Sequence, residues 1–355
     1  MENYKILTIN PGSTSTKIGI FENENLLLEQ TLRHSTEELE IFENIYSQLQ
    51  FREQLIENFL KNENIDLSEF SAIVGRGGLV KPMISGTYEI NEELIQDLKN
   101  AIGGSHASNL GGILAKEIAK KHNLKSFIVD PVVVDEMDEV ARITGIKNVF
   151  RKSKFHALNQ KAVAKRFAKE INRNYEELNL IVVHLGGGIS VGAHRKGRVI
   201  DVTNAIGGEG PFTPERCGQI PADEIIEMCY SGNYQKSDMK KLISGTGGIT
   251  SLLGTNDVRE ILKNLENPET KLIYDAFIYQ IAKEIGAMAT TLNGDIDQII
   301  LTGGIAYSEV VTGDIIEKIK FISEITIYPG EDELLALCQG ALRILNNYEK
   351  VKIYD

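Results

Sequence analysis

Residues 180–204 read LIVVHLGGGISVGAHRKGRVIDVTN, and this stretch decides the fold. An apolar run ends at His184, three glycines follow, and two more strand-like runs are separated by a Lys-Gly turn. Residues 5–32, KILTINPGSTSTKIGIFENENLLLEQTL, repeat this order of strand, Gly-containing turn, strand, turn and strand. Placing Asn10 on His184 aligns the two copies without a gap as far as the third strand. The sequence therefore predicts two related domains, each opened by a three-stranded β-meander.

The rest of the chain alternates short apolar strands with helical periodicity. Four further strands are predicted at SAIVG (71–75), SFIVD (126–130), QIILTGG (298–304) and EITIYPG (324–330). Helices are predicted over 37–60, 92–101, 109–122, 157–172, 222–230, 238–243, 258–264, 268–292, 308–320 and 332–346. The expected class is α/β, with a mixed sheet of meander plus parallel strands in each domain and helices around it. We expect a first domain of residues 1–154 with 333–355, and a second of residues 155–332.

Composition limits the class of protein. A chain of 355 residues with 42% hydrophobic content suits two domains with sizeable cores. The net charge of -12 argues against nucleic acid or an acidic membrane surface as a partner. Three widely spaced cysteines favour a reducing compartment. The start of the chain has no signal-peptide pattern, and no apolar run approaches the roughly 18 residues of a membrane span, so we expect a cytoplasmic protein.

Three Gly-containing turns, each directly after a strand, are candidate phosphate sites. In the first, Gly12 allows close approach, while Asn10, Ser13, Ser15 and Lys17 supply donors and one positive charge. The alternative is an ordinary polar hairpin turn.

The second turn is Gly186, Gly187 and Gly188, beside a possible phosphoryl donor in His184, which could equally be a buried core histidine. The third is Gly303 and Gly304 before a helix, a geometry that points backbone amides at a nucleotide, although a plain tight turn is the alternative. None of the turns fits the P-loop or G-x-G-x-x-G pattern.

The duplicated meander with its three Gly turns resembles the superfamily of acetate and sugar kinases, heat-shock chaperones and actin, in which two domains close on ATP in a cleft. Longer motifs are similar to the acetate and butyrate kinase family, and to its butyrate kinase branch most of all. They follow one another in the family's order: INPGSTSTK (9–17), VGRGGLVKP (74–82), SHASNLGGILA (105–115), SFIVDP (126–131), KFHALNQKAVA (154–164), HLGGGISVGA (184–193), PFTPERCGQIPADE (211–224), LTGGIAYSE (301–309) and PGEDELLALCQGALR (329–343). The resemblance covers the chain from Lys5 to about Leu345.

The resemblance implies a kinase that reversibly transfers the γ-phosphoryl group of ATP to a short-chain fatty acid by direct in-line transfer. Butyrate is the expected acid, giving butanoyl phosphate and ADP, with isobutyrate, propionate or acetate as alternatives. The family also implies ATP/ADP and Mg²⁺ as cofactors and a dimer or larger homo-oligomer. A carboxylate with a pKa of about 4–5 is already ionised, so it needs positive charge around the moving phosphoryl group rather than a general base.

The family's motifs assign roles to individual residues. Arg76 and Arg216 would clamp the carboxylate and phosphoryl oxygens, with His184 and His106 as donors beside them. Asp130 and Glu333, with Asp332 as a neighbouring candidate, would orient Mg²⁺. The plainer alternatives are surface charges for the arginines, a turn cap for Asp130, and acids favoured by the start of the last helix for the other two.

The remaining assignments concern the nucleotide and the acyl chain. The adenosine half is expected over Gly303 and Gly304, with Asp257 as a polar contact, unless Asp257 only caps a helix. Residues resembling the family's apolar acyl pocket are Val80, Phe155 and Pro214, which could also be plain core.

Two departures from acetate kinases stand out. Gln160 stands where acetate kinases carry a second histidine after the phenylalanine, so that histidine's role cannot be transferred. The loop from Thr213 to Arg216 is shorter, which puts the placement of Arg216 in doubt and suits a longer acyl chain. Two rival functions are a non-catalytic ATP-driven switch, and a polyphosphate or guanosine-phosphate hydrolase on the same fold.

Overall fold

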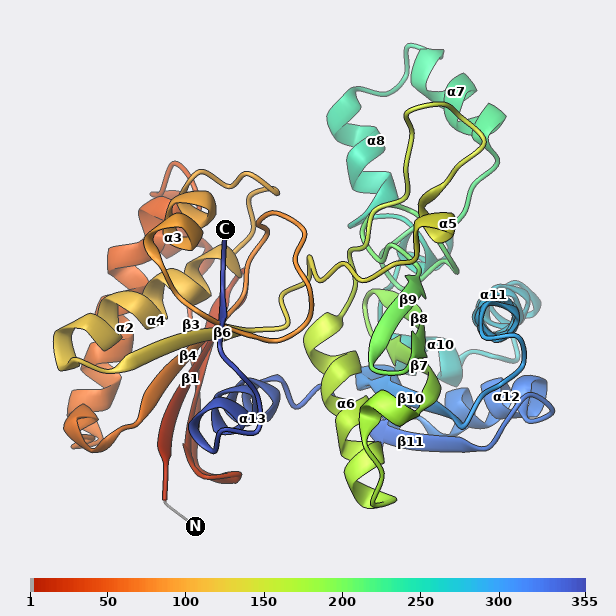
Figure 1. The fold of residues 1–355 in the computed structure, drawn as a ribbon. Coiled ribbons are helices and arrows are strands. Elements are labelled where there is room, and N and C mark those ends of the chain that lie inside the picture. The colour runs from red at the N-terminus through yellow and green to blue at the C-terminus, as the bar shows by residue number, and fades with distance from the viewer. Residues whose placement is uncertain (1–2) are drawn as a thin grey trace. The chain divides into compact units, whose positions relative to one another are not determined.

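A computed structural model describes residues 3–355, and the chain forms two compact units. The first runs to Val134 and resumes over Asp332–Asp355, and the second is Asp135–Glu331 (Figure 1). Residues 135–154, expected in the first domain, pack with the second unit, where the backbone N–H of Asp138 donates to the carbonyl of Ile200 (2.9 Å). The domain bounds expected from the sequence, 1–154 with 333–355 and 155–332, stay a prediction.

The first unit is built on a seven-stranded mixed sheet in the order β12-β5-β6-β4-β1-β2-β3. Strands β1, β2 and β3 form the predicted antiparallel meander, and β4 and β6 continue the sheet parallel to β1. Strand β5 is antiparallel to β6, and β12 pairs with β5 in parallel. The bounds are β1 Lys5–Pro11, β2 Ser15–Glu22, β3 Asn25–Arg33, β4 Ala72–Arg76, β5 Thr87–Glu89, β6 Lys125–Val129 and β12 Lys352–Ile353.

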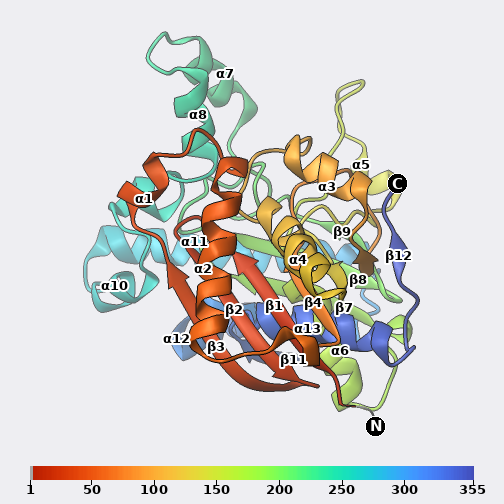
Figure 2. The ribbon, with the colours of Figure 1, turned by 90° about the vertical axis from the view of Figure 1, so that its left-hand side faces the viewer.

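Helices cover both faces of this sheet (Figure 2). Helices α2 (Leu49–Asn62), α3 (Glu92–Lys99) and α4 (Asn109–His122) share one apolar core with the sheet, and α13 (Glu333–Leu345) packs on the opposite face. Helix α4 approaches β4 so closely that a Cβ on Gly75 would lie 2.0 Å from the carbonyl oxygen of Gly111. Glycine at both positions therefore permits this contact.

The long helix predicted over 37–60 is wrong in its first half. The chain forms a short α1 (Thr36–Glu40), a bend, and the 3₁₀ turn η1 (Tyr46–Gln48) before α2 begins. Between them, the side chains of Asn44 and Ser47 each accept a hydrogen bond from the other's backbone N–H (3.0 and 3.2 Å). These local bonds compete with the helical ladder, which apolar spacing alone does not reveal.

The second unit repeats the first. Its five-stranded sheet has the order β11-β10-β7-β8-β9, which matches β6-β4-β1-β2-β3. The bounds are β7 Asn179–Leu185, β8 Ile189–Arg195, β9 Arg198–Val202, β10 Gln298–Gly303 and β11 Ile325–Pro329. The duplication is confirmed with one adjustment: Asn10 lies opposite Lys17, whereas His184 lies opposite Ser190, so the second hairpin turn is one residue shorter.

Alternate residues of β7 face the two helical layers of this unit. Ile181 and Val183 pack with α11 (Pro268–Thr291) and α12 (Glu309–Ile319), while Leu180 and Val182 pack with α6 (Ala157–Glu170). A strand buried on both faces explains the continuous apolar run in its sequence. The other helices of the unit are α5 Glu139–Arg142, α7 Ala222–Tyr230, α8 Lys236–Ile243, α9 Ile249–Leu253 and α10 Val258–Lys263.

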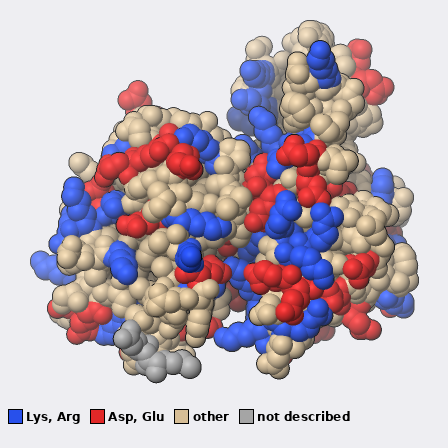
Figure 3. All heavy atoms as spheres, viewed as in Figure 1, with Lys and Arg blue, Asp and Glu red and all other residues tan. Residues whose placement is uncertain are grey.

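Charged side chains of both signs are interspersed on the face shown in Figure 3. Helices α7 and α8 extend away from the sheet of their unit (Figure 1), and α7 buries none of its residues. Within residues 3–355, no helix combines the length and apolar character required to cross a bilayer.

Candidate active site

The first predicted loop is a tight turn between β1 and β2. The backbone N–H of Gly12 donates to the carbonyl of Ser15 (2.8 Å), and the side chain of Ser13 is exposed. Lys17 is also exposed and lies opposite Asn10 in the hairpin. The structure therefore places these four predicted phosphate contacts at one end of the hairpin.

A buried arginine that sequence patterns did not single out holds this turn. Arg52 of α2 is 0% exposed, and its guanidinium donates to the carbonyls of Gly12 (2.9 Å), Ser13 (3.1 Å) and Ser15 (3.1 Å). It also donates to the hydroxyl of Thr16 (3.1 Å). Burial lowers the pKa of Arg52 to about 10, so it stays charged at neutral pH. The available signal was an arginine on the apolar face of a helix.

Three predicted residues of the first unit meet in one cluster. Asn10 is the penultimate residue of β1, Arg76 ends the neighbouring β4, and Glu333 is the first residue of α13. Oε2 of Glu333 accepts from Nδ2 of Asn10 (2.6 Å) and from Nη1 of Arg76 (2.8 Å), and Arg76 Nη1 also lies 3.2 Å from Oδ1 of Asn10. Among residues 3–355, Nε and Nη2 of Arg76 form no hydrogen bond, which leaves one edge of the guanidinium for an anion.

The other two candidate Mg²⁺ ligands do not join that cluster. Asp130 follows β6 with φ of +37°, is 3% exposed, and accepts from the hydroxyl of Ser85 (2.6 Å) and the N–H of Gly86 (2.7 Å). Asp332 is exposed and precedes α13. In the described chain no three His, Cys, Asp or Glu side chains are grouped to hold a metal. Carboxylate oxygens suit Mg²⁺ through its waters, but the assignment stays a prediction.

His106 bonds within its own loop, and Val80 belongs to the core of the first unit. His106 is exposed just before α4, and its Nδ1 accepts from the backbone N–H of Ser108 (3.2 Å). Asn109 ties two loops together, accepting from the N–H of Leu79 (2.8 Å) and donating to Gly104. Val80 is 3% exposed within the core of the first unit, so its placement favours the core alternative.

In the second unit, His184 is buried at the end of β7. Its Nδ1 lies 2.8 Å from Oδ1 of Asn159, whose Nδ2 donates to the carbonyl of Glu331 (3.1 Å). Because that amide orientation presents an acceptor, Nδ1 of His184 carries the proton. Nε2 of His184 lies 3.4 Å from Oε1 of Glu331. The ring of His156 stacks on that of His184, with centroids 3.7 Å apart.

The glycine loop and Arg216 come together, which settles where the shorter loop puts this arginine. A Cβ on Gly188 would lie 1.8 Å from Nη1 of Arg216, so the guanidinium occupies the space that glycine leaves. Nη1 of Arg216 donates to the carbonyl of Ala205, and burial lowers the pKa of Arg216. Its Nε and Nη2 form no hydrogen bond within the described residues, as for Arg76.

The segment 212–216 also covers the glycine loop. The hydroxyl of Thr213 donates to the carbonyl of Gly187 (2.7 Å), and the carboxyl group of Glu215 lies beside the same glycine. A phosphate bound at this loop would meet that carboxylate, so binding there requires Glu215 to move or a cation to intervene. Phe155 and Pro214 of the predicted acyl pocket are both buried in this unit.

The third loop and Asp257 show separate local roles. Gly303 has φ of +92°, and a Cβ there would lie 2.3 Å from the carbonyl oxygen of Leu185, whereas nothing lies within 4 Å of a Cβ on Gly304. A short 3₁₀ turn, η4 (Gly304–Tyr307), follows. Asp257 is the N-cap of α10, and its bonds to the side chain and backbone of Arg259 lower its pKa to about 2. The capping alternative is realised, and the nucleotide contact stays a prediction.

Comparison with known proteins now identifies the family. A model described as the acetokinase family matches residues 140–328. A probable butyrate kinase of Clostridium botulinum is 56% identical over 99% of this chain and 100% of its own length. Butyrate kinase 1 of Clostridium acetobutylicum is 55% identical over 99% of both chains.

The chain belongs to the acetokinase family.

The fold of the chain agrees with that assignment. Acetate kinase of Porphyromonas gingivalis matches it with a TM-score of 0.79 at 19% identity, covering 96% of this chain and 100% of the other. The expectation of an α/β fold shared with acetate kinases is thereby confirmed.

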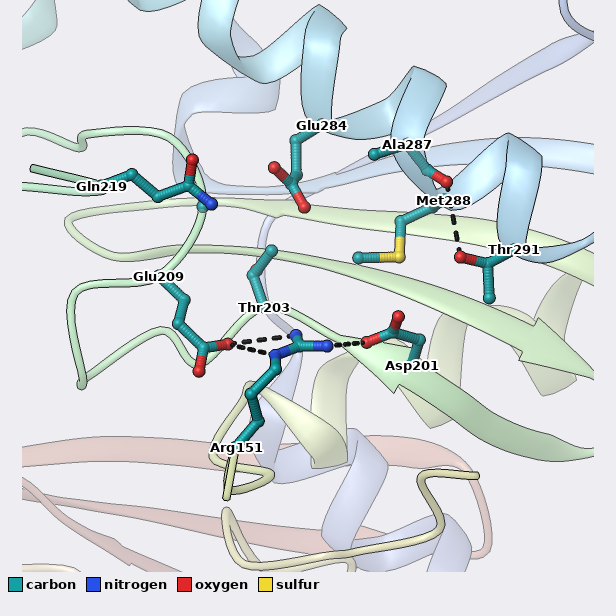
Figure 4. A pocket seen from close by; sticks show the side chains of 10 residues that line it. Arg151, Asp201, Thr203, Glu209, Gln219, Glu284, Ala287, Met288 and Thr291 are labelled. Atoms are coloured by element: carbon teal, nitrogen blue, oxygen red, sulfur yellow. Dashed lines mark hydrogen bonds and ion pairs between the residues drawn. The ribbon is translucent and has the colours of Figure 1, made fainter. Parts of the chain in front are cut away.

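A cavity of about 400 Å³ in the second unit is lined by none of the predicted site residues (Figure 4). Arg151 lies in the wall of the cavity and bonds to Asp201 (2.8 Å) and Glu209 (3.1 Å). Its guanidinium also donates to two backbone carbonyls. Glu284 of α11 faces the same space, and burial raises its pKa. The cavity thus presents mainly acceptors, and no predicted role uses it.

Proposed function

We propose that this member of the acetokinase family is a butyrate kinase, which transfers the γ-phosphoryl group of ATP to the carboxylate of butyrate, reversibly, to give butanoyl phosphate and ADP. The observation that carries the proposal is the match, over 99% of the chain, to relatives from two Clostridium species described as butyrate kinases, at 55–56% identity. In each unit an arginine with donors left open supports a reaction of anions.

In the first unit, Arg76 acts as one half of the clamp. Its Nη1 is anchored by Glu333 and Asn10, while the Nε–Nη2 edge is available to a carboxylate or phosphoryl group. A guanidinium anchored on one side and open on the other binds such groups in bidentate fashion. The turn of Ser13, Ser15 and Lys17 supplies further donors to phosphate oxygens, and His106 would add another.

In the second unit, Arg216 acts as the other half. It lies on Gly188 with its Nε and Nη2 donors available, next to the loop that we assign to the phosphates of ATP, Gly186 to Gly188. His184 has one ring nitrogen fixed by Asn159 and the other directed toward Glu331, so it is positioned to interact with a transferring phosphoryl group. The residues supply charge and orientation, because phosphoryl transfer gains most from these.

The proposal includes ATP and Mg²⁺ as cofactors. Glu333, with Asp130 and Asp332 as further candidates, would hold Mg²⁺, which supplies charge neutralisation between phosphate oxygens. Adenosine would lie over Gly303 and Gly304, where the exposed second glycine leaves open space. The acyl chain would use Phe155, Pro214 and Val80, although each is buried in the structure.

The test is a coupled assay with Mg-ATP and a panel of C2–C6 acids, trapping acyl phosphate as hydroxamate. The expected result is acid-dependent hydroxamate with the highest kcat/KM for butyrate. One methylene changes discrimination by only about 1–3 kcal/mol, so neighbouring acids should react too. Phosphate release without any acid and without hydroxamate would refute the proposal and favour the ATP-driven switch or the hydrolase.

A variant separates binding from catalysis. Arg216→Ala should lose most turnover while the affinity for ATP is largely kept, because Arg216 is assigned to the moving group. Unchanged turnover would remove Arg216 from the clamp. We also propose a cytoplasmic location and a dimer or larger homo-oligomer, which fractionation and sedimentation would test.

A further inference from the structure

A chain of hydrogen bonds runs through the interior of the second unit from Tyr175 to His156. The hydroxyl of Tyr175 lies 2.7 Å from Nδ1 of His194, and Nε2 of His194 lies 3.0 Å from Oε1 of Gln160. Nε2 of Gln160 lies 2.9 Å from Oγ of Ser190, which lies 2.9 Å from Nδ1 of His156. His194, Gln160 and Ser190 are each 0% exposed. Bulk water therefore does not compete for these bonds.

The direction of each bond follows from one fixed amide. Nε2 of Gln160 also donates to the backbone carbonyl of Ser190 (3.0 Å), which can only accept. Oε1 of Gln160 therefore faces His194, and Nε2 of His194 must carry a proton. Burial, together with the charge of Lys161, holds the pKa of His194 well below its usual value, so the ring is neutral. Its Nδ1 then accepts from the hydroxyl of Tyr175.

The same logic continues to His156. The hydroxyl oxygen of Ser190 accepts from Gln160, and the backbone N–H of His156 also points at it (3.5 Å). Among residues 3–355, Nδ1 of His156 is the acceptor available to the hydroxyl proton of Ser190. His156 thus receives a hydrogen bond at Nδ1 and carries its proton on Nε2.

Close packing at Gly192 of β8 supports this chain. A Cβ at that position would lie 2.5 Å from Oε1 of Gln160 and 3.3 Å from Nε2 of His194. The two bonded groups therefore meet over backbone that has no side chain, and they have little room to move.

His156 matters because its ring lies flat on that of His184, with an angle of 9° between the planes. Two positively charged imidazoles at 3.7 Å would repel each other. A hydroxyl proton directed into Nδ1 of His156 opposes protonation there, so it disfavours a pair of charged rings at this contact.

We propose that Tyr175, His194, Gln160 and Ser190 are positioning residues that hold His156 neutral, with its proton on Nε2, against His184. Gln160 stands in place of the acetate kinases' second histidine. Its amide oxygen accepts from His194 and its amide nitrogen donates to Ser190, so the orientation of this one amide fixes the direction of the bonds on both sides of it. The inference rests on the proposed function only for its effect on phosphoryl transfer, where His156 would present an N–H donor.

Nitrogen-15 NMR of the full-length protein tests the proton's position without any turnover. At neutral pH, Nδ1 of His156 should resonate as an unprotonated acceptor and Nε2 as a protonated nitrogen, with His156→Gln providing the assignment. Ser190→Ala should give a mixture of tautomers, and Ser190→Thr, which keeps the hydroxyl, should restore the original signal. A wild-type Nδ1–H, or a Ser190→Ala spectrum identical to wild type, would overturn the inference.

Kinetics then test the distant end of the chain with a matched pair. Tyr175 and Tyr328 are buried in the same apolar cluster, and mutation to Phe removes the hydroxyl that bonds to His194 and to Glu170 respectively. Tyr175→Phe should lower kcat by up to about tenfold with KM for ATP unchanged and alter the His156 signal, whereas Tyr328→Phe should do neither. Equal effects of the two variants would overturn the positioning role.

Failure of this inference differs from failure of the proposed function. If no acid is phosphorylated, the hydroxamate assay refutes the proposed function, while the nitrogen signals of His156 still report the direction of the hydrogen bonds from Tyr175 to His156. If acids are phosphorylated and the signals contradict an Nε2–H tautomer, the proposed function stands and the positioning role is refuted.

Discussion

Replacing Arg52 by methionine tests whether one buried guanidinium holds the first phosphate turn in place. Methionine can fill the space of the aliphatic stem but makes none of the four bonds to Gly12, Ser13, Ser15 and Thr16, and it also loses the two bonds to Oε1 of Gln48. A hydrogen bond contributes about 1 kcal/mol net. Water can reach the exposed Ser13, so the expected loss from the turn is at least about 3 kcal/mol, a large part of the roughly 5–15 kcal/mol that stabilises a typical protein.

The measurement is urea unfolding followed by circular dichroism, since the chain has no tryptophan to report by fluorescence. Arg52→Lys should lose less than Arg52→Met, because an ammonium has three donors but cannot span all four acceptors. Gln54→Met on the exposed side of the same helix is the control, with a change within about 0.5 kcal/mol. If Arg52→Met matches that control, the turn is held by other contacts and the reasoning is refuted.

The Arg52 variants also connect stability to the site. Without the bonds from Arg52, the turn should bind the phosphates of ATP less well. The KM of Arg52→Met for Mg-ATP should therefore be higher than that of the wild type, when both are measured without urea and well below the unfolding temperature. An unchanged KM would separate this turn from the phosphates, whatever the stability result.

Three further predictions concern single positions. Gly188→Ala should lower kcat strongly while the fold persists, because a Cβ 1.8 Å from Nη1 of Arg216 forces that flexible side chain away; activity equal to wild type would contradict it. Gly304→Ala should leave the melting temperature unchanged, since its Cβ meets nothing within 4 Å, but raise KM for ATP if adenosine lies over it. Burial and the charge of Arg52 lower the pKa of His34 to about 4. Between about pH 6.5 and 4, the unfolded chain therefore binds more protons than the folded chain. The free energy of unfolding should fall by at most about 3 kcal/mol as the pH drops through that range. His34→Phe should abolish this dependence in urea titrations at pH 7 and 5; an equal pH dependence in the variant would show that another group is responsible.

Much of the fold could be predicted because its signals are local. Apolar runs bounded by Gly, Pro and Asn gave the strands of both meanders, and spacing of three and four gave most helices. The repeated pattern predicted a mixed sheet of the same kind in each half of the chain. The helix predicted over 37–60 failed because Asn44 and Ser47 satisfy backbone groups with their own side chains, a competition that hydrophobic spacing does not register.

The site was predicted less completely. Motifs placed Asn10, Arg76 and Glu333 in one family pattern, and the structure brings these three together. His106 bonds within its own loop, and Asp130 bonds to Ser85 and Gly86 from a distant segment of the chain, which no sequence pattern indicated. Residue types indicate which chemistry is possible, but the hydrogen-bond partner of a side chain depends on which segment the fold places next to it.

The sequence by itself determined two β-meanders, their Gly turns and the kinds of group at each strand end, because these depend on neighbours a few residues away. Tertiary structure alone decided that Glu333 pairs with Arg76 across 257 positions, that Arg52 grips the first turn, and that Tyr175 is linked to His156. Those pairings arise from burial, where each polar group left without water must find a partner in whatever segment packs against it.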